Sequence, residues 1–165
     1  MTNLRTRQAL LILTAAAALA GPSTAIAATA TATMGVTATV QATCLVSATD
    51  VAFGIYTGAL TSATSTISVT CTNTTPYTVG LSAGVSAGAT VATRKMTGPS
   101  AALLGYGLYQ DAAYTLNWGT TVSTDTEAGT GTGSQQGVTV YGRVPAGQYV
   151  APGAYTDTIT ATVTF

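Results

Sequence analysis

The hydrophobic pattern of the chain is most regular over residues 28–44, ATATATMGVTATVQATC, where small apolar residues alternate with Thr, Gly and Gln. A period of two directs alternate side chains to opposite faces of an extended strand. At strand geometry this stretch would span roughly 55 Å, about three times the length of a typical strand. We therefore predict that its first half pairs with another molecule and that its second half, from about Val36, is the domain's own first strand. Gly35 is the expected junction between the two.

The alternation returns further along the chain, and no segment after residue 27 has helical periodicity. Residues 65–71 and 77–83 carry apolar side chains at every second position, and the turn composition of residues 73–76 predicts two antiparallel strands joined by a short turn. Asp157 lies on the apolar face of the last such segment, so we expect it at the end of a sheet or hydrogen-bonded. The other expected elements are an edge strand at 94–96 whose adjacent charges discourage unwanted pairing, strands at 103–109, 138–144 and 154–165, a hairpin anchored by Trp118, and a mobile surface loop at 123–137.

Many short strands with turn signals between them predict an antiparallel β-sandwich. Local pattern leaves the order of the strands open. The 138 residues after position 27 correspond to one domain.

Residues 1–27 have the features of a secretory signal peptide. Arg5 and Arg7 form a positive start, an apolar run follows from Ala9 to Ala20, and Ala25-Ile26-Ala27 precedes the expected cleavage point. A membrane anchor is the alternative, but an apolar run of about twelve residues is too short to span a bilayer. We therefore expect an exported protein.

Charge is scarce after the signal, with three cations against five acids and no His, which gives a net charge of minus two. Nucleic acid is an unsuitable partner, because phosphate binding depends on clustered Lys and Arg. A basic patch for a membrane surface is missing as well. Such a weakly charged surface protects a monomer poorly from association and suits a protein that is packed in an assembly.

The two cysteines of the chain, Cys44 and Cys71, both lie in the exported part, where a disulfide is the economical interpretation. A metal site is the weaker alternative, because two thiols without His do not complete a tetrahedral zinc site. We expect no bound metal and no cofactor.

Catalytic interpretations find little support, and we predict that the protein is not an enzyme. Without His there is no Ser-His or Cys-His pair to activate a nucleophile. Asp125 and Glu127 are close in sequence only within a Gly-rich loop, and the GTGTGSQQG motif there lacks the Lys and the helix of a phosphate loop. An aromatic sugar-binding platform is a further alternative, although packing in the core and between paired strands is the favoured role of its candidate residues, which are Tyr106, Tyr109, Tyr114 and Trp118.

An ordered set of motifs through the exported part resembles the spore coat protein U domain family, which includes subunits of archaic (Csu-type) chaperone-usher pili. The motifs are VTATVQATC around Cys44, VAFGIY at Val51, ISVTCT ending at Thr72, PYTVGLSAG from Pro76, RKM at Arg94, LLGYGLYQD from Leu103, NWG at Asn117, VYGRVPAGQ at Val140, and PGAYTDTITATVTF to the C-terminus.

This resemblance implies an incomplete immunoglobulin-like sandwich that lacks its last strand. It also implies a periplasmic chaperone that fills the gap, an outer-membrane usher, and identical subunits that donate the missing strand to one another in a fibre. The resemblance divides the chain into a signal peptide at 1–27, a donor strand at 28–36 and a pilin domain at 37–165. The implied donor side chains are Ala30, Ala32, Met34 and Val36, and the implied acceptor groove is lined partly by Ile159, Val163 and Phe165.

The first function hypothesis is therefore a structural subunit of an extracellular pilus that supports surface attachment and biofilm formation. A secreted coat protein that does not form long fibres is the second. A carbohydrate-binding tip adhesin is the third, and the single domain and donor-like segment favour the first over it.

Overall fold

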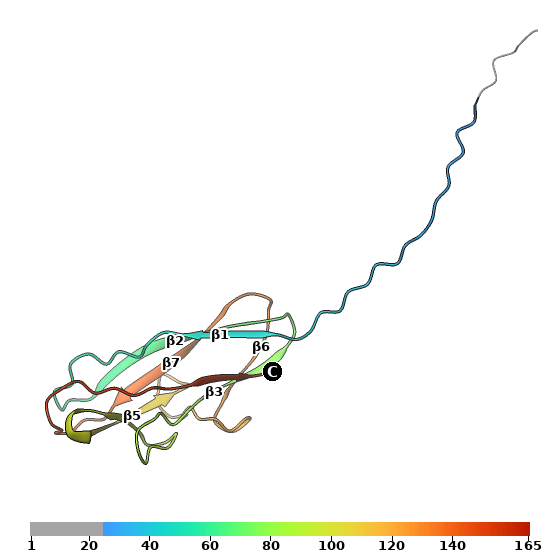
Figure 1. The fold of residues 1–165 in the computed structure, drawn as a ribbon. Coiled ribbons are helices and arrows are strands. Elements are labelled where there is room, and N and C mark those ends of the chain that lie inside the picture. Colours follow the sequence, from blue (N-terminus) through green and yellow to red (C-terminus); the bar gives the residue numbers. More distant parts are fainter. Residues whose placement is uncertain (1–24) are drawn as a thin grey trace, which may run out of the picture. The chain divides into compact units, whose positions relative to one another are not determined.

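The computed structural model describes residues 25–165. The expected signal peptide lies outside the described residues except for its last three positions. All the strands belong to one compact unit, Thr39–Phe165, while the chain up to Ala38 forms a separate unit. Residues 25–38 of that second unit are an extended, fully exposed segment without strand pairing (Figure 1).

In residues 25–165, eight strands form two antiparallel sheets. The five-stranded sheet has the order β1-β2-β7-β5-β4, and the three-stranded sheet has the order β6-β3-β8. A single 3-10 turn, Pro99–Ala101, is the only helical element in residues 25–165, and no helix there is long and apolar enough to cross a membrane. The strands are β1 (Cys44–Ala48), β2 (Thr61–Cys71), β3 (Pro76–Leu81), β4 (Arg94–Thr97), β5 (Leu103–Tyr109), β6 (Glu127–Thr130), β7 (Gln136–Val144) and β8 (Ala161–Thr164).

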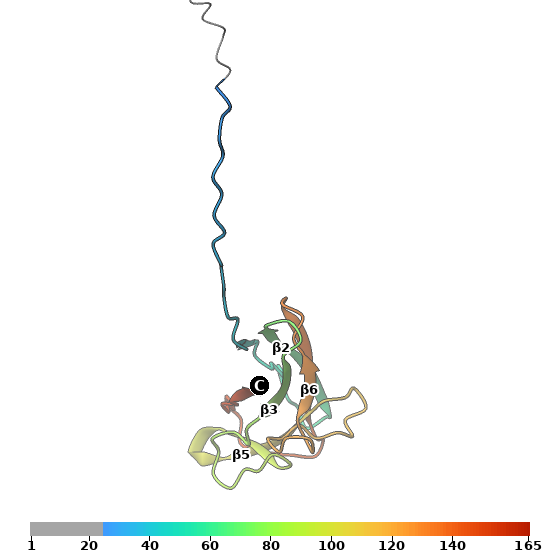
Figure 2. The ribbon, with the colours of Figure 1, turned by 90° about the vertical axis from the view of Figure 1, so that its right-hand side faces the viewer.

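The core lies between the two sheets (Figure 2) and follows from the alternation along each strand. Trp118 is completely buried, and its indole Nε1 donates a hydrogen bond of 2.8 Å to the carbonyl oxygen of Val79. The predicted anchoring role of Trp118 is thereby confirmed. The other buried apolar residues are Ile67, Val69, Cys71, Tyr77, Val79, Leu81, Leu104, Tyr106, Leu108, Val140 and Val144.

Arg94 differs from its prediction. β4 is an edge strand as expected, but the Arg94 side chain is only 1% exposed and points into the core instead of discouraging pairing from the surface. Burial lowers the pKa of its guanidinium. The positive charge is accommodated because the guanidinium donates hydrogen bonds of 2.6 to 2.9 Å to four backbone carbonyl oxygens, those of Leu81, Ser82, Val91 and Trp118.

Two predicted strand arrangements are wrong. The domain's first strand begins at Cys44, about eight residues after the expected Val36, so the unpaired opening stretch is longer than predicted. β2 and β3 are joined by a short turn as expected, but they lie in different sheets. Both strands direct their apolar side chains into the core, so the turn between them crosses from one sheet to the other.

The prediction of a mobile loop at residues 123–137 is also wrong. It contains β6, which pairs with β3, and the beginning of β7. Asp125 further ties it down, because its carbonyl oxygen accepts from Gly119 N and its carboxylate accepts from Thr121 N. Polar residues in this segment form hydrogen bonds within the fold, so a polar composition here does not mean a mobile loop.

The expected last strand at 154–165 is interrupted. Thr156 forms an isolated bridge to Thr97 of β4, and regular pairing resumes only in β8, beside β3. The C-terminal stretch therefore crosses from the edge of the larger sheet to the smaller sheet.

A disulfide joins Cys44 to Cys71, as expected, and the two residues are directly opposite in the register of β1 and β2. It holds the edge strand β1 on the sheet at the point where the chain enters the domain.

We predict that replacing both cysteines with Ser lowers the free energy of unfolding by roughly 3 kcal/mol, because the bridge restricts the unfolded chain. Chemical denaturation of the purified chain followed by Trp118 fluorescence measures this change. Thr70→Ser, on the outer face of β2, is the matched control. Equal midpoints for the double variant and the parent protein would show that the bridge contributes nothing to stability.

Candidate functional site

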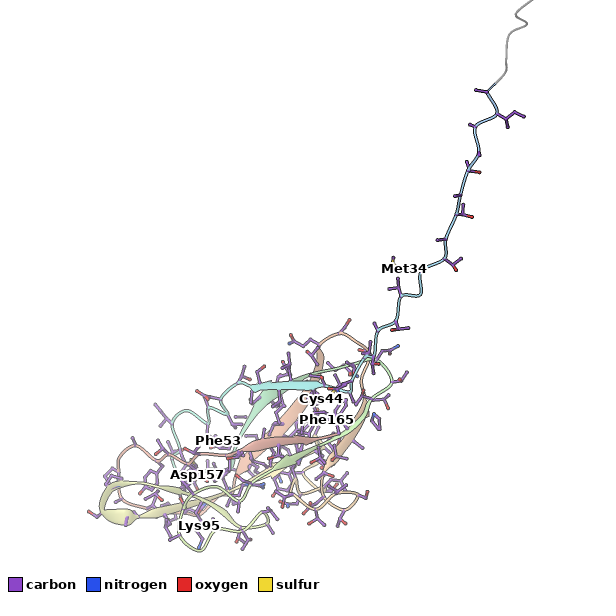
Figure 3. All side chains as sticks on the ribbon, turned by 45° about the vertical axis from the view of Figure 1, so that its right-hand side comes forward. Met34, Cys44, Phe53, Lys95, Asp157 and Phe165 are labelled. Atoms are coloured by element: carbon purple, nitrogen blue, oxygen red, sulfur yellow. A yellow bond between two sulfur atoms is a disulfide. The ribbon has the colours of Figure 1, made fainter. Side chains whose placement is uncertain are left out.

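Two strand edges are left unpaired beside each other. β1 has β2 as its single neighbour and β8 has β3, although β1 and β8 belong to different sheets and contact each other. An edge strand exposes a row of free N–H and C=O groups that can pair with a further strand. In Figure 3, Cys44 of β1 and Phe165 just after β8 lie at the same end of the domain.

Beyond this end the two edges separate. Regular pairing of β1 stops at Ala48, and the C-terminal stretch starts at the opposite side of the sandwich, where Thr156 bridges Thr97. A cavity of about 620 Å³ opens between them, and a second of about 750 Å³ adjoins it through shared lining residues that include Phe53, Met96 and Tyr155. We call this combined cavity the inter-sheet groove.

The walls of the inter-sheet groove come from both sheets and its floor is the hydrophobic core. β2, β5 and β7 contribute core side chains from the larger sheet, and β3 and β8 contribute side chains from the smaller one. These side chains are Ile67, Leu108, Val140, Leu81 and Ala161. An apolar groove between two free strand edges has the form that accepts one more strand.

A polar pair interrupts the apolar lining. The Tyr106 hydroxyl donates to the Asp157 carboxylate over 2.7 Å, and that carboxylate also accepts from the backbone N–H groups of Val85 and Thr158, both at 2.9 Å. Burial, and then the hydrogen bond to Asp157, raise the pKa of the Tyr106 hydroxyl. The ring of Phe53 packs edge-on against Tyr106, and Figure 3 shows Phe53 and Asp157 in the same region. The expectation that Asp157 is hydrogen-bonded is confirmed.

The implied acceptor residues have different positions. Ile159 is half-buried and lines the inter-sheet groove. Val163 is half-buried against the core, and Phe165 is 57% exposed at the C-terminus. Both lie at the end where β8 contacts β1, and neither lines the groove. Their role as acceptor residues stays a prediction.

The segment after β1 forms a groove wall that the sequence pattern did not predict. Residues 48–53 line the first cavity, and Phe53 also packs against the core. The apolar run VAFGIY was the available signal. It was not interpreted as a wall because it has neither clean alternation nor a strand partner.

The implied donor residues all lie in the unpaired opening stretch. Ala30, Ala32, Met34 and Val36 are exposed, and Met34 reaches 85% exposure, with its side chain projecting from the extended segment in Figure 3. Burying large apolar side chains such as these against another surface would be favourable, because it removes apolar area from water. The donor assignment itself stays a prediction.

The aromatic candidates are divided between two places. Tyr106 and Trp118 are buried in the core, in agreement with the favoured interpretation. Tyr109 and Tyr114 instead contact each other on the outer face of the larger sheet.

Within residues 25–165 no group of three or more His, Cys, Asp and Glu side chains could hold a metal ion.

Two antiparallel sheets around an open apolar groove define an all-β, immunoglobulin-like sandwich. The family model of the Spore Coat Protein U domain matches residues 30–162, and the chain belongs to that family. The resemblance noted in the sequence motifs is thereby confirmed.

Two similar proteins illustrate the family. Protein U of Myxococcus xanthus is 42% identical over 78 residues, which are 47% of this chain and 43% of that protein. A chain in the crystal structure of the CsuC-CsuE chaperone-tip adhesion subunit pre-assembly complex, from archaic chaperone-usher Csu pili of Acinetobacter baumannii, is 26% identical with a TM-score of 0.57. The match covers 77% of this chain and 40% of that one, so this chain spans less than half the length of either relative.

We predict that Tyr106→Phe lowers the free energy of unfolding by roughly 1.5 to 3 kcal/mol, because it removes a hydrogen bond to a charged group. Urea denaturation measures the change. Tyr77→Phe is the matched control, since Tyr77 is equally buried and its hydroxyl donates no hydrogen bond in the structure, and it should change stability by less than about 0.5 kcal/mol. An equal effect of both substitutions would contradict a stabilising role for the Tyr106–Asp157 pair.

Proposed function

We propose that this protein is a structural subunit of an extracellular chaperone-usher pilus, assembled by donor-strand exchange. The observation that carries the proposal is the inter-sheet groove, which opens onto the core between two free strand edges. In the fibre, residues 28–36 of one copy occupy the groove of the next copy. The similarity to a subunit of archaic Csu pili supports this assignment.

The chemistry of the opening stretch matches the groove. A donor strand that pairs with a free edge supplies main-chain hydrogen bonds, and its alternate side chains face the core. Met34 and Val36 each contribute about 1.5 to 3 kcal/mol when fully buried. Ala30 and Ala32 bury little area, so backbone pairing, Met34 and Val36 provide most of the binding free energy.

Before assembly the groove needs a temporary occupant, because an open apolar groove and free strand edges promote aggregation. We propose that a periplasmic chaperone fills it and that an outer-membrane usher exchanges the chaperone for the donor strand. The fibres support attachment and biofilm formation at the cell surface.

A second candidate function is a secreted coat protein that does not form long fibres. The similarity to Protein U supports this alternative. Negative-stain electron microscopy of material sheared from the cell surface distinguishes the two, because only a pilus subunit gives long filaments.

We predict that deleting residues 28–34 stops fibre assembly without preventing folding, because every strand of the domain and the disulfide remain. The truncated subunit should co-purify with its chaperone, and surface fibres should be absent in electron micrographs. Loss of the chaperone complex would show that these residues belong to the subunit's own sheet. Fibres of normal length would refute the donor-strand assignment.

We predict the same loss of fibres for Met34→Asp, because an unpaired charge in an apolar groove costs several kcal/mol. Thr33→Asp is the matched control: it adds the same charge one residue away, on the opposite face of the strand. Fibre yield should fall far more for Met34→Asp than for Thr33→Asp when both are scored by electron microscopy. Equal yields would contradict the alternation on which the donor register depends.

A further inference from the structure

A second group of side chains has no role in the inter-sheet groove. It lies on the outer face of the five-stranded sheet, where β5 and β7 pair with Tyr109 opposite Tyr141 and Gly107 opposite Arg143. Leu108 and Val140 on the same strands face the core, so their sequence neighbours Tyr109 and Tyr141 face outward. Tyr114, from the loop after β5, completes this tyrosine–arginine cluster, which consists of Tyr109, Tyr114, Tyr141 and Arg143.

The cluster is held by edge-to-face aromatic contacts and one cation–π contact. The ring centroids of Tyr109 and Tyr114 are 5.5 Å apart at 86°, and those of Tyr114 and Tyr141 are 6.4 Å apart at 82°. The guanidinium carbon of Arg143 lies 3.8 Å from the centroid of Tyr114. This stacking orients a planar group with five donors.

The donors of Arg143 are unused. Within residues 25–165 its guanidinium forms no hydrogen bond and no ion pair, and its Nε is buried without a partner. The buried Arg94, by contrast, donates to four carbonyl oxygens. The buried Nε is covered by protein atoms, whereas the two terminal NH2 groups, which also have no partner, are exposed enough for a ligand to reach.

The loop that carries Tyr114 is held in an unfavourable conformation. Tyr114 has a φ of 59°, in the left-handed region that large side chains rarely adopt. The Asp111 carboxylate fixes this loop by accepting from the backbone N–H groups of Thr115 and Leu116, and those bonds, led by the one from Leu116, lower its pKa. Strained residues held in this way are concentrated at functional sites.

Gly107 provides the space that the cluster needs. A Cβ atom at this position would lie 2.6 Å from the Tyr109 hydroxyl oxygen, so any larger residue would displace that ring. The exposed hydroxyl residues Ser62 and Thr64 of β2 lie opposite Arg143 and Tyr141 in the register of β2 and β7. The site thus combines aromatic faces, a free guanidinium and neighbouring hydroxyl groups.

We propose that the tyrosine–arginine cluster binds a carboxylate-bearing saccharide, such as a uronic acid unit of an extracellular polysaccharide. Arg143 donates two parallel hydrogen bonds to the sugar carboxylate. The tyrosine rings pack against the apolar face of the sugar ring and their hydroxyls hydrogen-bond its edge. Ser62 and Thr64 bind further hydroxyl groups of the chain of sugars.

A saccharide fits this surface better than an acidic peptide strand does. β2, β5 and β7 each have a neighbour on both sides, so the face offers no free backbone edge for strand addition. Recognition there depends on side chains alone. Rings and hydroxyls around one cation match a carboxylated sugar.

Binding of oligogalacturonate to the purified full chain, measured by isothermal titration calorimetry, tests the proposal. Dextran oligosaccharides of equal length supply sugar rings without carboxylates, and poly-glutamate supplies carboxylates without sugar rings. The variants are Arg143→Gln, Arg143→Lys and Tyr114→Leu, with Lys95→Gln as the control that removes a cation elsewhere on the surface. Thermal unfolding of each variant establishes that it is folded.

The expected result is binding of oligogalacturonate at least ten times tighter than binding of dextran or poly-glutamate. Arg143→Gln and Tyr114→Leu should weaken it about tenfold or more, Arg143→Lys should weaken it severalfold, and Lys95→Gln less than twofold. Equal binding of poly-glutamate would indicate an acidic protein partner and overturn the saccharide assignment. Absence of oligogalacturonate binding, or equal losses in Arg143→Gln and Lys95→Gln, would overturn the site.

Discussion

The hydrophobic core of this domain is not covered on all sides, and this constraint governs the rest of the structure. β1 and β8 contact each other at the disulfide end and then separate, since β1 remains with the larger sheet while the C-terminal stretch begins at β4. The separation leaves Ile67, Leu108 and Val140 at the floor of the inter-sheet groove. Apolar side chains next to free backbone groups favour occupation of the groove by an extended chain over exposure to water.

A sandwich with an open side needs other means to hold its sheets together. The disulfide holds β1 at one end. The Arg94 guanidinium joins the end of β3 to the hairpin around Trp118 through backbone carbonyls. Asp157 connects β5 to the C-terminal stretch through Tyr106. These polar contacts are directional, so they position the groove walls more precisely than apolar packing alone would.

Two surfaces of this weakly charged domain suit different kinds of ligand. The inter-sheet groove uses backbone edges and apolar area, which suits a strand. The tyrosine–arginine cluster uses side chains in the middle of a fully paired sheet, which suits a small polar ligand. The cluster lies on the outer face of the larger sheet and the groove lies between the sheets, so the two sites share no residue.

Alternation along the chain was sufficient to predict the all-β class, the inward faces of β2 and β3 and the hydrogen bonding of Asp157, because side chains in a strand alternate between two faces whatever its partners are. The anchoring role of Trp118 was predicted because it is the single Trp of the chain and lies in an expected hairpin. The chain has just two cysteines, and both lie in the part expected to be exported, which made a disulfide the simplest outcome. The family motifs, read from the sequence, indicated the open sandwich.

Tertiary structure alone decided the remainder. Residues 123–137 became β6 and the start of β7 because β3 and β2 supplied partners that local composition does not reveal. Arg94 faced the core because carbonyl oxygens of the β3 end and of Trp118 converge there. Arg143 met Tyr114 because β5 and β7 are neighbours. Pattern determines which face a side chain occupies, whereas the partners across that face depend on strand order, which local sequence does not encode.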